Sequence, residues 1–179
     1  QGVVLGELGR PGEAVAAFDR ALALQPNAMT WNNRGAALRA ERRHAEALES
    51  FDRALALDPR FVGALYNRAL TLSDLGRPAE ALVVLDGLLA ADPRMAAALL
   101  SRGAVLHALE RFEEAAQTYE RLLALQPELP VAWANLGDAL QRLRRSPEAL
   151  ECYDRALALA PERGETWLRR GHVLASLRR

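Results

Sequence analysis

Proline recurs in this chain at a nearly constant interval, at Pro26, Pro59, Pro93, Pro127 and Pro161, with spacings of 33, 34, 34 and 34 residues. Near-identical segments end at four of these prolines: FDRALALQP, FDRALALDP, YERLLALQP and YDRALALAP. Self-similarity at a fixed period of this size is typical of proteins built from stacked units. Such a chain buries its apolar residues between neighbouring units, so its 179 residues need not surround one common core.

Each unit carries two apolar patterns with helical spacing. An alanine twelve residues before the proline is followed four residues later by a large apolar residue, as in Ala47 and Phe51. Upstream of this pair, a second pattern places Trp133, Gly137 and Leu140 at relative positions 0, 4 and 7. Residues three or four apart share one face of a helix. Each unit is therefore predicted to consist of two helices.

These helices are short, so packing must stabilise them. A helix of about 13 residues is about 20 Å long and is marginal alone in water. The glycine or alanine of the first helix and the recurrent alanine of the second are expected to let the paired helices approach closely. The recurring proline cannot continue a helix, so it should end the second helix. Pro11, Pro78 and Pro147 suit the first turn of a new helix.

The recurring Trp, Gly, Ala, aromatic and Pro positions resemble the tetratricopeptide repeat over the whole chain. The resemblance implies an all-α fold, an α-solenoid in which antiparallel helix pairs of about 34 residues form a right-handed superhelix. In this register one array spans residues 1–179. Residues 1–26 form a partial unit, residues 27–59, 60–93, 94–127 and 128–161 form complete units, and residues 162–179 form the first helix of a further unit.

The sequence departs from the repeat pattern in three ways. Arg34, Arg68, Arg102 and Arg170 replace the usual Leu three residues after the Trp or Leu, and we expect their stems to pack and their heads to reach water. The interval from Pro26 to Trp31 is one residue short, which predicts a tighter turn. In the last unit, the apolar side formed by Trp167, Val173, Leu174 and Leu177 is expected to be only partly covered.

The composition argues against several enzyme classes. All 23 basic residues are arginine, so no lysine is present for a phosphate-binding loop or a Schiff base. There is no HExxH, CxxC, GxSxG or GxGxxG motif, and GVVLGELG at residues 2–9 has glycines at the wrong intervals. Cys152 is expected to be a small buried apolar residue. His44, His107 and His172 lie in different units, so we expect no metal site, no cofactor and no catalytic residue.

The charge balance and the apolar runs also limit the partners. Basic and acidic residues number 23 each, so no global field attracts nucleic acid or an anionic membrane. The arginine clusters RAERRHAEA and QRLRRSPEA raise RNA as a rival partner, but they fall at predicted turns and contain glutamate, so we do not favour it. No apolar run approaches the roughly 20 residues of a membrane span. No secretory leader is visible, and we favour a cytoplasmic location.

In tetratricopeptide arrays the first helices line a concave groove, and the residue two positions after the Trp or Leu points into it. Here this position holds Asn33, Asn67, Ser101, Asn135 and Arg169. The asparagines resemble the ladder of the tetratricopeptide superhelix in O-linked N-acetylglucosamine transferases, which implies capture of a peptide backbone. The same register adds further groove candidates: Asn32, Arg39, Tyr66, Leu70, Asp74, Leu100, His107, Asp138, Gln141, Arg142 and His172.

Two modes of acid recognition bear on this groove. The Lys and Asn clamp of chaperone-binding repeat domains is missing, since the matching positions are Met29, Gly63, Ala97 and Val131. Arg142 and Arg169, near Asn135, remain candidates to hold an acidic group bidentately.

The sequence therefore predicts a non-catalytic scaffold whose groove binds a peptide or protein segment. Two alternatives stay open: the chain recruits substrates for a larger enzyme such as a glycosyltransferase, or it self-associates through its open terminal helices.

Overall fold

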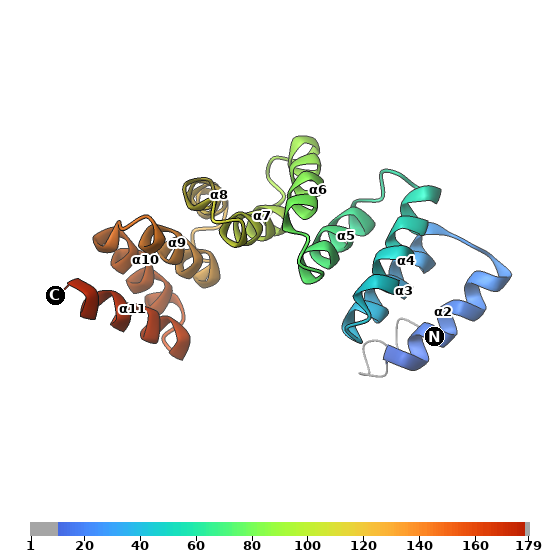
Figure 1. Cartoon of the computed structure of the whole chain (residues 1–179), viewed down its shortest axis with the longest axis horizontal. Coiled ribbons are helices and arrows are strands. Elements are labelled where there is room, and N and C mark those ends of the chain that lie inside the picture. The colour runs from blue at the N-terminus through green and yellow to red at the C-terminus, as the bar shows by residue number, and fades with distance from the viewer. Residues whose placement is uncertain (1–10, 178–179) are drawn as a thin grey trace. The chain divides into compact units, whose positions relative to one another are not determined.

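The computed structural model describes residues 11–177, and within this range every regular element is an α-helix (Figure 1). The segment GVVLGELG lies outside the described residues. The helices are α2 (Pro11–Leu24), α3 (Ala28–Ala40), α4 (His44–Leu57), α5 (Val62–Asp74), α6 (Pro78–Ala91), α7 (Ala96–Ala108), α8 (Phe112–Leu125), α9 (Pro130–Arg142), α10 (Ser146–Leu159) and α11 (Gly164–Leu177). The predicted all-α fold is confirmed.

The chain divides into two compact parts, an N-terminal part of residues 1–88 and a C-terminal part of residues 89–179. We call α3, α5, α7, α9 and α11 the first helices and α2, α4, α6, α8 and α10 the second helices. In the N-terminal part, α3 packs against α2, α4 and α5. In the C-terminal part, α9 packs against α7, α8, α10 and α11. Each of these two first helices, α3 and α9, is thus covered by second helices and contacts a neighbouring first helix.

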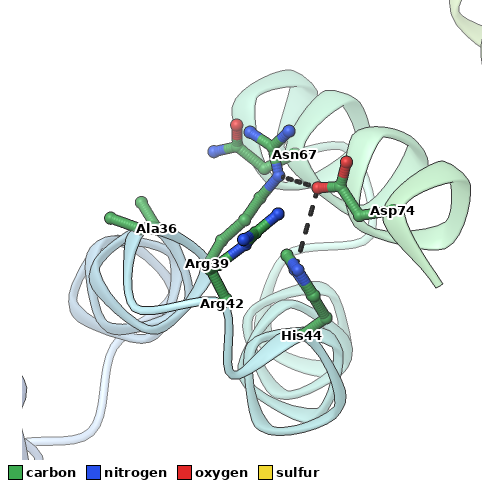
Figure 2. Close-up of a pocket in the computed structure, with 7 residues that line it drawn as sticks. Ala36, Arg39, Arg42, His44, Asn67 and Asp74 are labelled. Carbon is green, nitrogen blue, oxygen red and sulfur yellow. Dashed lines mark hydrogen bonds and ion pairs between the residues drawn. The ribbon is translucent and has the colours of Figure 1, made fainter.

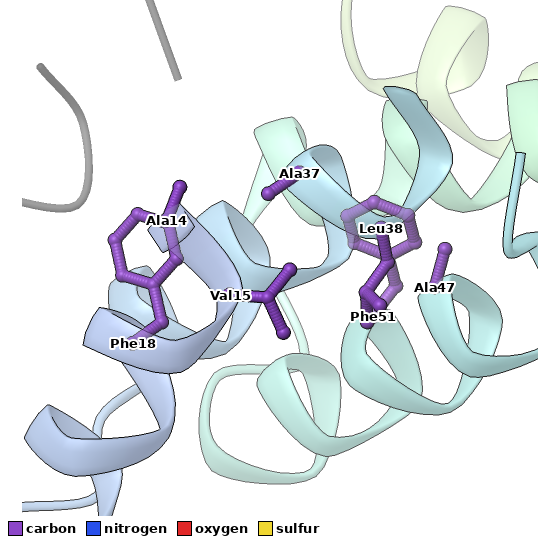
Figure 3. Close-up of a cluster of buried hydrophobic side chains, with 7 residues drawn as sticks. All are labelled: Ala14, Val15, Phe18, Ala37, Leu38, Ala47 and Phe51. Atoms are coloured by element: carbon purple, nitrogen blue, oxygen red, sulfur yellow. The ribbon is translucent and has the colours of Figure 1, made fainter. Parts of the chain in front are cut away.

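The core of the N-terminal part is shared between units. Figure 3 shows side chains from three successive helices meeting in one buried cluster: Ala14, Val15 and Phe18 of α2, Ala37 and Leu38 of α3, and Ala47 and Phe51 of α4. Burying a Phe or Leu side chain contributes about 1.5–3 kcal/mol. Because α2 belongs to one predicted unit and α3 to the next, the burial of the α2 side chains is gained only when units stack.

Glycines of the first helices lie against aromatic rings of the second helices. A Cβ added to Gly35 would lie 2.6 Å from the Phe51 ring. The same contact recurs for Gly103 against Tyr119 at 2.5 Å and for Gly137 against Tyr153 at 2.7 Å. The three rings are at most 1% exposed. The predicted close approach of the paired helices is confirmed, since even one methyl group at these glycines would overlap a buried ring.

Several predicted local features are also confirmed. Helices α2 and α6 begin at Pro11 and Pro78, and Pro147 lies in the first turn of α10. The turn between α2 and α3 has only three residues, and its Asn27 side chain accepts a hydrogen bond of 2.8 Å from the Thr30 amide. This cap provides a hydrogen-bond acceptor for one of the backbone N–H groups left unpaired at the start of α3.

The last helix is only partly covered, as predicted. Trp167 is 51% exposed and Leu177 is 52% exposed, together with Leu168 at 60%. Val173 corrects the prediction, because its side chain is fully buried. The exposed large apolar side chains of α11 are therefore those of Trp167, Leu168 and Leu177.

The arginines at the usual Leu position do not simply reach water, and this corrects the sequence prediction. Three of them pair with an aspartate of the preceding second helix: Arg34 with Asp19 at 2.6 Å, Arg68 with Asp52 at 2.7 Å, and Arg170 with Asp154 at 2.6 Å. The Arg34 guanidinium also donates to the buried Ser50 hydroxyl at 2.7 Å. Their heads therefore link successive units.

Four turns between a first and a second helix share one backbone conformation. They place Arg42, Gly76, Glu110 and Arg144 at φ values of 62°, 69°, 59° and 62°. In the first of these turns the Arg43 amide donates to the Leu38 carbonyl at 3.0 Å, which satisfies an orphan carbonyl at the end of α3. The left-handed conformation favours glycine, yet three of the four residues are charged.

An arginine and a glutamate join at the start of four second helices. Arg43 donates from Nε and an NH group to both carboxylate oxygens of Glu46, at 2.7 and 2.6 Å. The equivalent pairs are Arg77 with Glu80, Arg111 with Glu114 and Arg145 with Glu148. In each pair the hydrogen bond from arginine lowers the pKa of the glutamate below its ordinary value of 4.5.

These four glutamates predict acid sensitivity. Because their pKa values are lower in the folded chain, their contribution to stability is present above about pH 4.5 and is lost as the pH falls through the folded values. A variant with all four changed to Gln should be less stable than the parent at about pH 7, and the difference should shrink at about pH 3. Urea unfolding followed by circular dichroism measures it, and a difference independent of pH would contradict the prediction.

Candidate peptide-binding surface

All twelve predicted groove residues lie on first helices, and none of them is buried. The N-terminal part holds six, on α3 and α5: Asn32, Asn33, Arg39, Tyr66, Asn67 and Asp74. The C-terminal part holds the other six, on α7, α9 and α11: Ser101, His107, Asn135, Asp138, Arg142 and Arg169. Because neighbouring first helices pack together within each part, each set lies on adjacent helices.

Asparagines of two successive first helices meet in the N-terminal part. The Asn67 amide of α5 donates to Asn32 Oδ1 of α3 at 3.0 Å, and the Asn32 amide donates to Asn33 Oδ1 at 3.4 Å. Asn33 and Asn67, the predicted successive ladder positions, are thus connected through Asn32. All three side chains keep some exposure, so they can also offer amide groups to a ligand. A ladder that continues to Asn135 stays a prediction.

A pocket of about 430 Å³ lies beside this cluster (Figure 2). Polar side chains dominate its lining, namely Arg39, Arg42, His44, Asn67 and Asp74. Arg39 Nε donates to Asp74 Oδ2 at 2.6 Å, and His44 Nδ1 lies 3.8 Å from the same oxygen. Figure 2 shows Arg39 and His44 approaching Asp74 from two sides, from the end of α3 and the start of α4.

Arg42 and His44 were missed as candidate site residues. The signal was present, because both belong to the ERRH segment in which the turn after α3 is predicted, and a turn between helices faces solvent. The prediction used helical register alone and therefore stopped at the end of the first helix. The pocket brings the turn and the first residue of α4 beside the asparagine of α5.

In the C-terminal part, Asp138 is the centre of a polar network. The Tyr153 hydroxyl donates to its Oδ1 at 2.8 Å, and an Arg169 NH group donates to its Oδ2 at 2.5 Å. Arg169 also donates to Glu165 at 2.5 Å. Burial raises the pKa of Asp138 above its ordinary value, although the Tyr153 hydrogen bond and the Arg169 charge act to lower it. The carboxylate depends on these two partners.

Asn135 lies at a second, smaller pocket. A side-chain hydrogen bond joins it to Tyr119, whose pKa is raised well above its usual range by burial. The pocket has a volume of about 140 Å³ and is lined by Ala104, His107, Tyr119, Asn135 and Asp138. The sequence predicts that Asn135, Asp138 and His107 share this surface, and the structure brings their side chains to one pocket.

Arg142 is held at the C-terminal end of α9. Its guanidinium lies 4.4 Å from the centre of the Phe112 ring and 3.6 Å from Glu110. The predicted capture of an acidic group by Arg142 and Arg169 therefore has competitors, because carboxylates of this chain already engage both guanidiniums. A ligand would have to displace Glu110 or Asp138 to bind there.

Two observations concern groups that could take part in chemistry. Within residues 11–177 no cluster of three or more His, Cys, Asp or Glu side chains could hold a metal ion. Cys152 is 5% exposed, and burial raises its pKa to about 12, as expected for an inert thiol.

A third pocket, of about 470 Å³, lies between Trp133 of α9 and Glu151, Asp154 and Arg155 of α10. Across residues 11–177 no helix is both long and apolar enough to cross a membrane.

Comparisons with known proteins agree on the type of repeat. A family profile described as tetratricopeptide repeat matches residues 1–60 and 66–130, and a second profile with this description matches residues 130–163. No curated protein matches the sequence.

Several solved structures share the fold. YrrB, a repeat protein of this type with an unusual peptide-binding site, has a TM-score of 0.81 at 21% identity, over 95% of this chain and 88% of its own. PilW, a type IV pilus biogenesis factor, has a TM-score of 0.89 at 24% identity, over 98% of this chain and 82% of its own. A thermophilic repeat protein of Thermus thermophilus, TTC0263, has a TM-score of 0.74 at 27% identity, over 97% of this chain and 95% of its own.

Proposed function

The chain belongs to the tetratricopeptide repeat family, and from this premise we propose that it is a non-catalytic scaffold that binds an extended segment of a partner protein along its first helices. Tetratricopeptide proteins bind proteins or peptides, and YrrB has a peptide-binding site on the same fold. In this chain the asparagines of α3 and α5 would supply the groups that recognise the segment.

One observation carries the proposal, namely the bridge from Asn67 to Asn32 between two successive first helices. It fixes amide groups on two neighbouring helices in one surface while leaving them partly exposed. An amide carries donors and an acceptor, which match the carbonyl and N–H groups of a peptide backbone. The hydrogen bond between the two side chains orients them before binding, which reduces the entropy lost when a ligand binds.

The surroundings of the cluster also suit a peptide. The pocket beside Asn67 is polar and open at a turn, so a side chain of an extended ligand can enter while its backbone meets the asparagines. By contrast, the arginines that link successive units are committed to aspartates of this chain. The first helices therefore carry two separate sets of polar residues, one for stacking and one for recognition.

Peptide selection tests this proposal. Random linear peptides of about twelve residues would be displayed and selected against the chain, and the dissociation constant of a selected peptide would be measured by fluorescence anisotropy. Asn33→Ala combined with Asn67→Ala should weaken binding about tenfold, because two amides facing the ligand are lost. The helical circular dichroism spectrum should be unchanged, since both residues lie at the surface.

The matched control changes two exposed residues of second helices, Arg20→Ala with Glu49→Ala. This variant should bind the selected peptide like the parent chain. Equal affinities for the parent and the asparagine variant, or a loss confined to the control, would remove the first helices as the binding surface.

Self-association is a second candidate, favoured by the exposed apolar side chains of Trp167, Leu168 and Leu177 on α11. Light scattering over a concentration series tests it. A mass that rises with concentration in the parent and stays monomeric in Leu168→Glu supports association through α11, and a constant monomer mass in the parent rejects it.

A further inference from the structure

The pocket beside the asparagine cluster carries an excess of positive charge. Two guanidiniums, Arg39 and Arg42, face one carboxylate, Asp74. Arg39 is held by Asp74 at 2.6 Å, whereas the Arg42 side chain makes no hydrogen bond or ion pair with any residue from 11 to 177. Arg42 is exposed at the turn after α3, so its donors face a ligand that enters the pocket.

The equivalent positions two repeat units further along the same chain provide a comparison for this pocket. At the positions of Arg39, Arg42, His44 and Asp74, the C-terminal part has His107, Glu110, Phe112 and Arg142. The charges at the turn and at the end of the next first helix are exchanged, since Arg42 and Asp74 correspond to Glu110 and Arg142. Asn67 and Asn135 occupy the same position in both.

The local charge differs between the two sites. The N-terminal pocket has two guanidiniums and one carboxylate, whereas the matching C-terminal positions have one guanidinium, Arg142, one carboxylate, Glu110, and the imidazole of His107. In addition, the backbone of the turn is the same, with φ of 62° at Arg42 and 59° at Glu110. The two sites therefore share their framework and their asparagine but differ in charge.

We propose that the N-terminal pocket receives an acidic side chain, Asp or Glu, of the bound segment. This rests on the proposed function, since Asn67 holds the ligand backbone beside the pocket. Arg42 supplies the unpaired cation, and Arg39, oriented by Asp74, supplies further N–H donors. A carboxylate balances the single excess charge, whereas a doubly charged phosphate would leave a negative charge next to Asp74.

The proposal predicts a preference for glutamate over glutamine in one position. The probes are two capped peptides, acetyl-Gly-Gly-Glu-Gly-Gly-amide and its Gln counterpart, titrated into the ¹⁵N-labelled chain. The Glu peptide should shift the amide signals of Arg42, His44 and Asn67, and its dissociation constant should be about fivefold lower than that of the Gln peptide. The difference should decrease at high salt, because the site is open to solvent.

Two variants locate the effect. Arg42→Gln should reduce the affinity for the Glu peptide to that of the Gln peptide. Arg144→Gln is the matched control, because Arg144 occupies the same turn position at φ 62° but lines neither pocket, and it should leave both affinities unchanged.

The outcomes separate this inference from the proposed function. Equal binding of the two peptides at the pocket would overturn the acidic preference and leave backbone recognition standing. Shifts at Asn135 and Arg142 in place of Arg42 and His44 would overturn the assignment to the N-terminal pocket. Absence of shifts with either peptide would also overturn it, while the selected-peptide experiment would still decide the proposed function.

Discussion

Gly35→Ala is expected to lower the free energy of unfolding by about 1–2 kcal/mol, although alanine favours helix by about 1 kcal/mol over glycine. The new methyl group would lie 2.6 Å from the Phe51 ring, and that ring is fully buried. Since the ring cannot retreat into solvent, α3 and α4 must move apart and lose packing along their contact. Urea unfolding monitored by circular dichroism measures the change.

A second substitution should rescue this variant. The unit of residues 60–93 carries Ala69 and Leu85 at the positions of Gly35 and Phe51. Phe51→Leu alone should cost about 1 kcal/mol by leaving space beside Gly35. Combined with Gly35→Ala, it should cost less than the sum of the two single changes, because the methyl group fills that space. If the costs of the two single changes simply add, the idea that Gly35 and Phe51 are matched in size is wrong.

Gly171→Ala is the matched control for the glycine effect. Gly171 has the same repeat position on α11, but a Cβ added there has no atom of the described residues within 4 Å. The substitution should therefore stabilise the chain by up to about 1 kcal/mol through helix propensity alone. Equal changes at Gly35 and Gly171 would show that the Phe51 contact is unimportant.

Arg169→Met is expected to destabilise the chain by about 1–2 kcal/mol at neutral pH. The substitution keeps an apolar stem but removes the guanidinium that donates to Asp138, so the carboxylate must rely on the Tyr153 hydroxyl. Breaking a fully buried pair costs about 3–5 kcal/mol. The smaller value is expected here because the Asp138 and Arg169 side chains keep 25% and 29% of their exposure.

The effect of Arg169→Met should depend on pH. Burial already raises the pKa of Asp138, and loss of the guanidinium should raise it further. A raised carboxyl pKa gives stability that is complete at low pH and is lost as the pH rises through the folded value. The cost should therefore be small near pH 3 and full near pH 7.

Arg170→Met provides the control on the same helix. Arg170 pairs with Asp154, whose side chain is 55% exposed, so its loss should cost less than about 1 kcal/mol. It should also show little dependence on pH above about 5, because water can solvate the aspartate that remains. A cost for Arg169→Met that does not grow with pH would contradict the role given to Asp138.

The helices were predictable because their periodicity repeats five times with the same partner residues. Gly137 and Tyr153 illustrate this, since a glycine and an aromatic residue sixteen positions apart recur together in three units. The contact between them follows from the spacing of two paired helices. Repetition thus supplied, within one sequence, the comparison that normally requires homologues.

The ion pairs between arginine and aspartate could also have been predicted from the sequence, but the prediction considered each arginine only within its own unit. Asp52 precedes Arg68 by 16 residues, and Asp154 precedes Arg170 by 16 residues. Where Leu136 replaces the arginine, the same earlier position holds Glu120. This correlation links one unit to the next, and it explains why the arginine heads are not simply exposed.

The site was less predictable, because helical register gives the face of a residue but not its hydrogen-bond partner. Asn135 and Asp138 were placed at the groove from register alone, yet Tyr119 and Tyr153 of the second helices also reach them. Which amides stay available depends on side-chain conformations across two helices. The partnership of Arg169 with Asp138 depends in the same way on the distance between α9 and α11.

The left-handed turns after the first helices have an evolutionary consequence. A non-glycine residue in this conformation costs about 1–2 kcal/mol, and the cost depends little on whether the side chain is Arg or Glu. A single amino-acid substitution at such a turn can therefore invert a local charge while the helices keep their places. A protein of this architecture can acquire new ligand preferences through residues that its folding does not require.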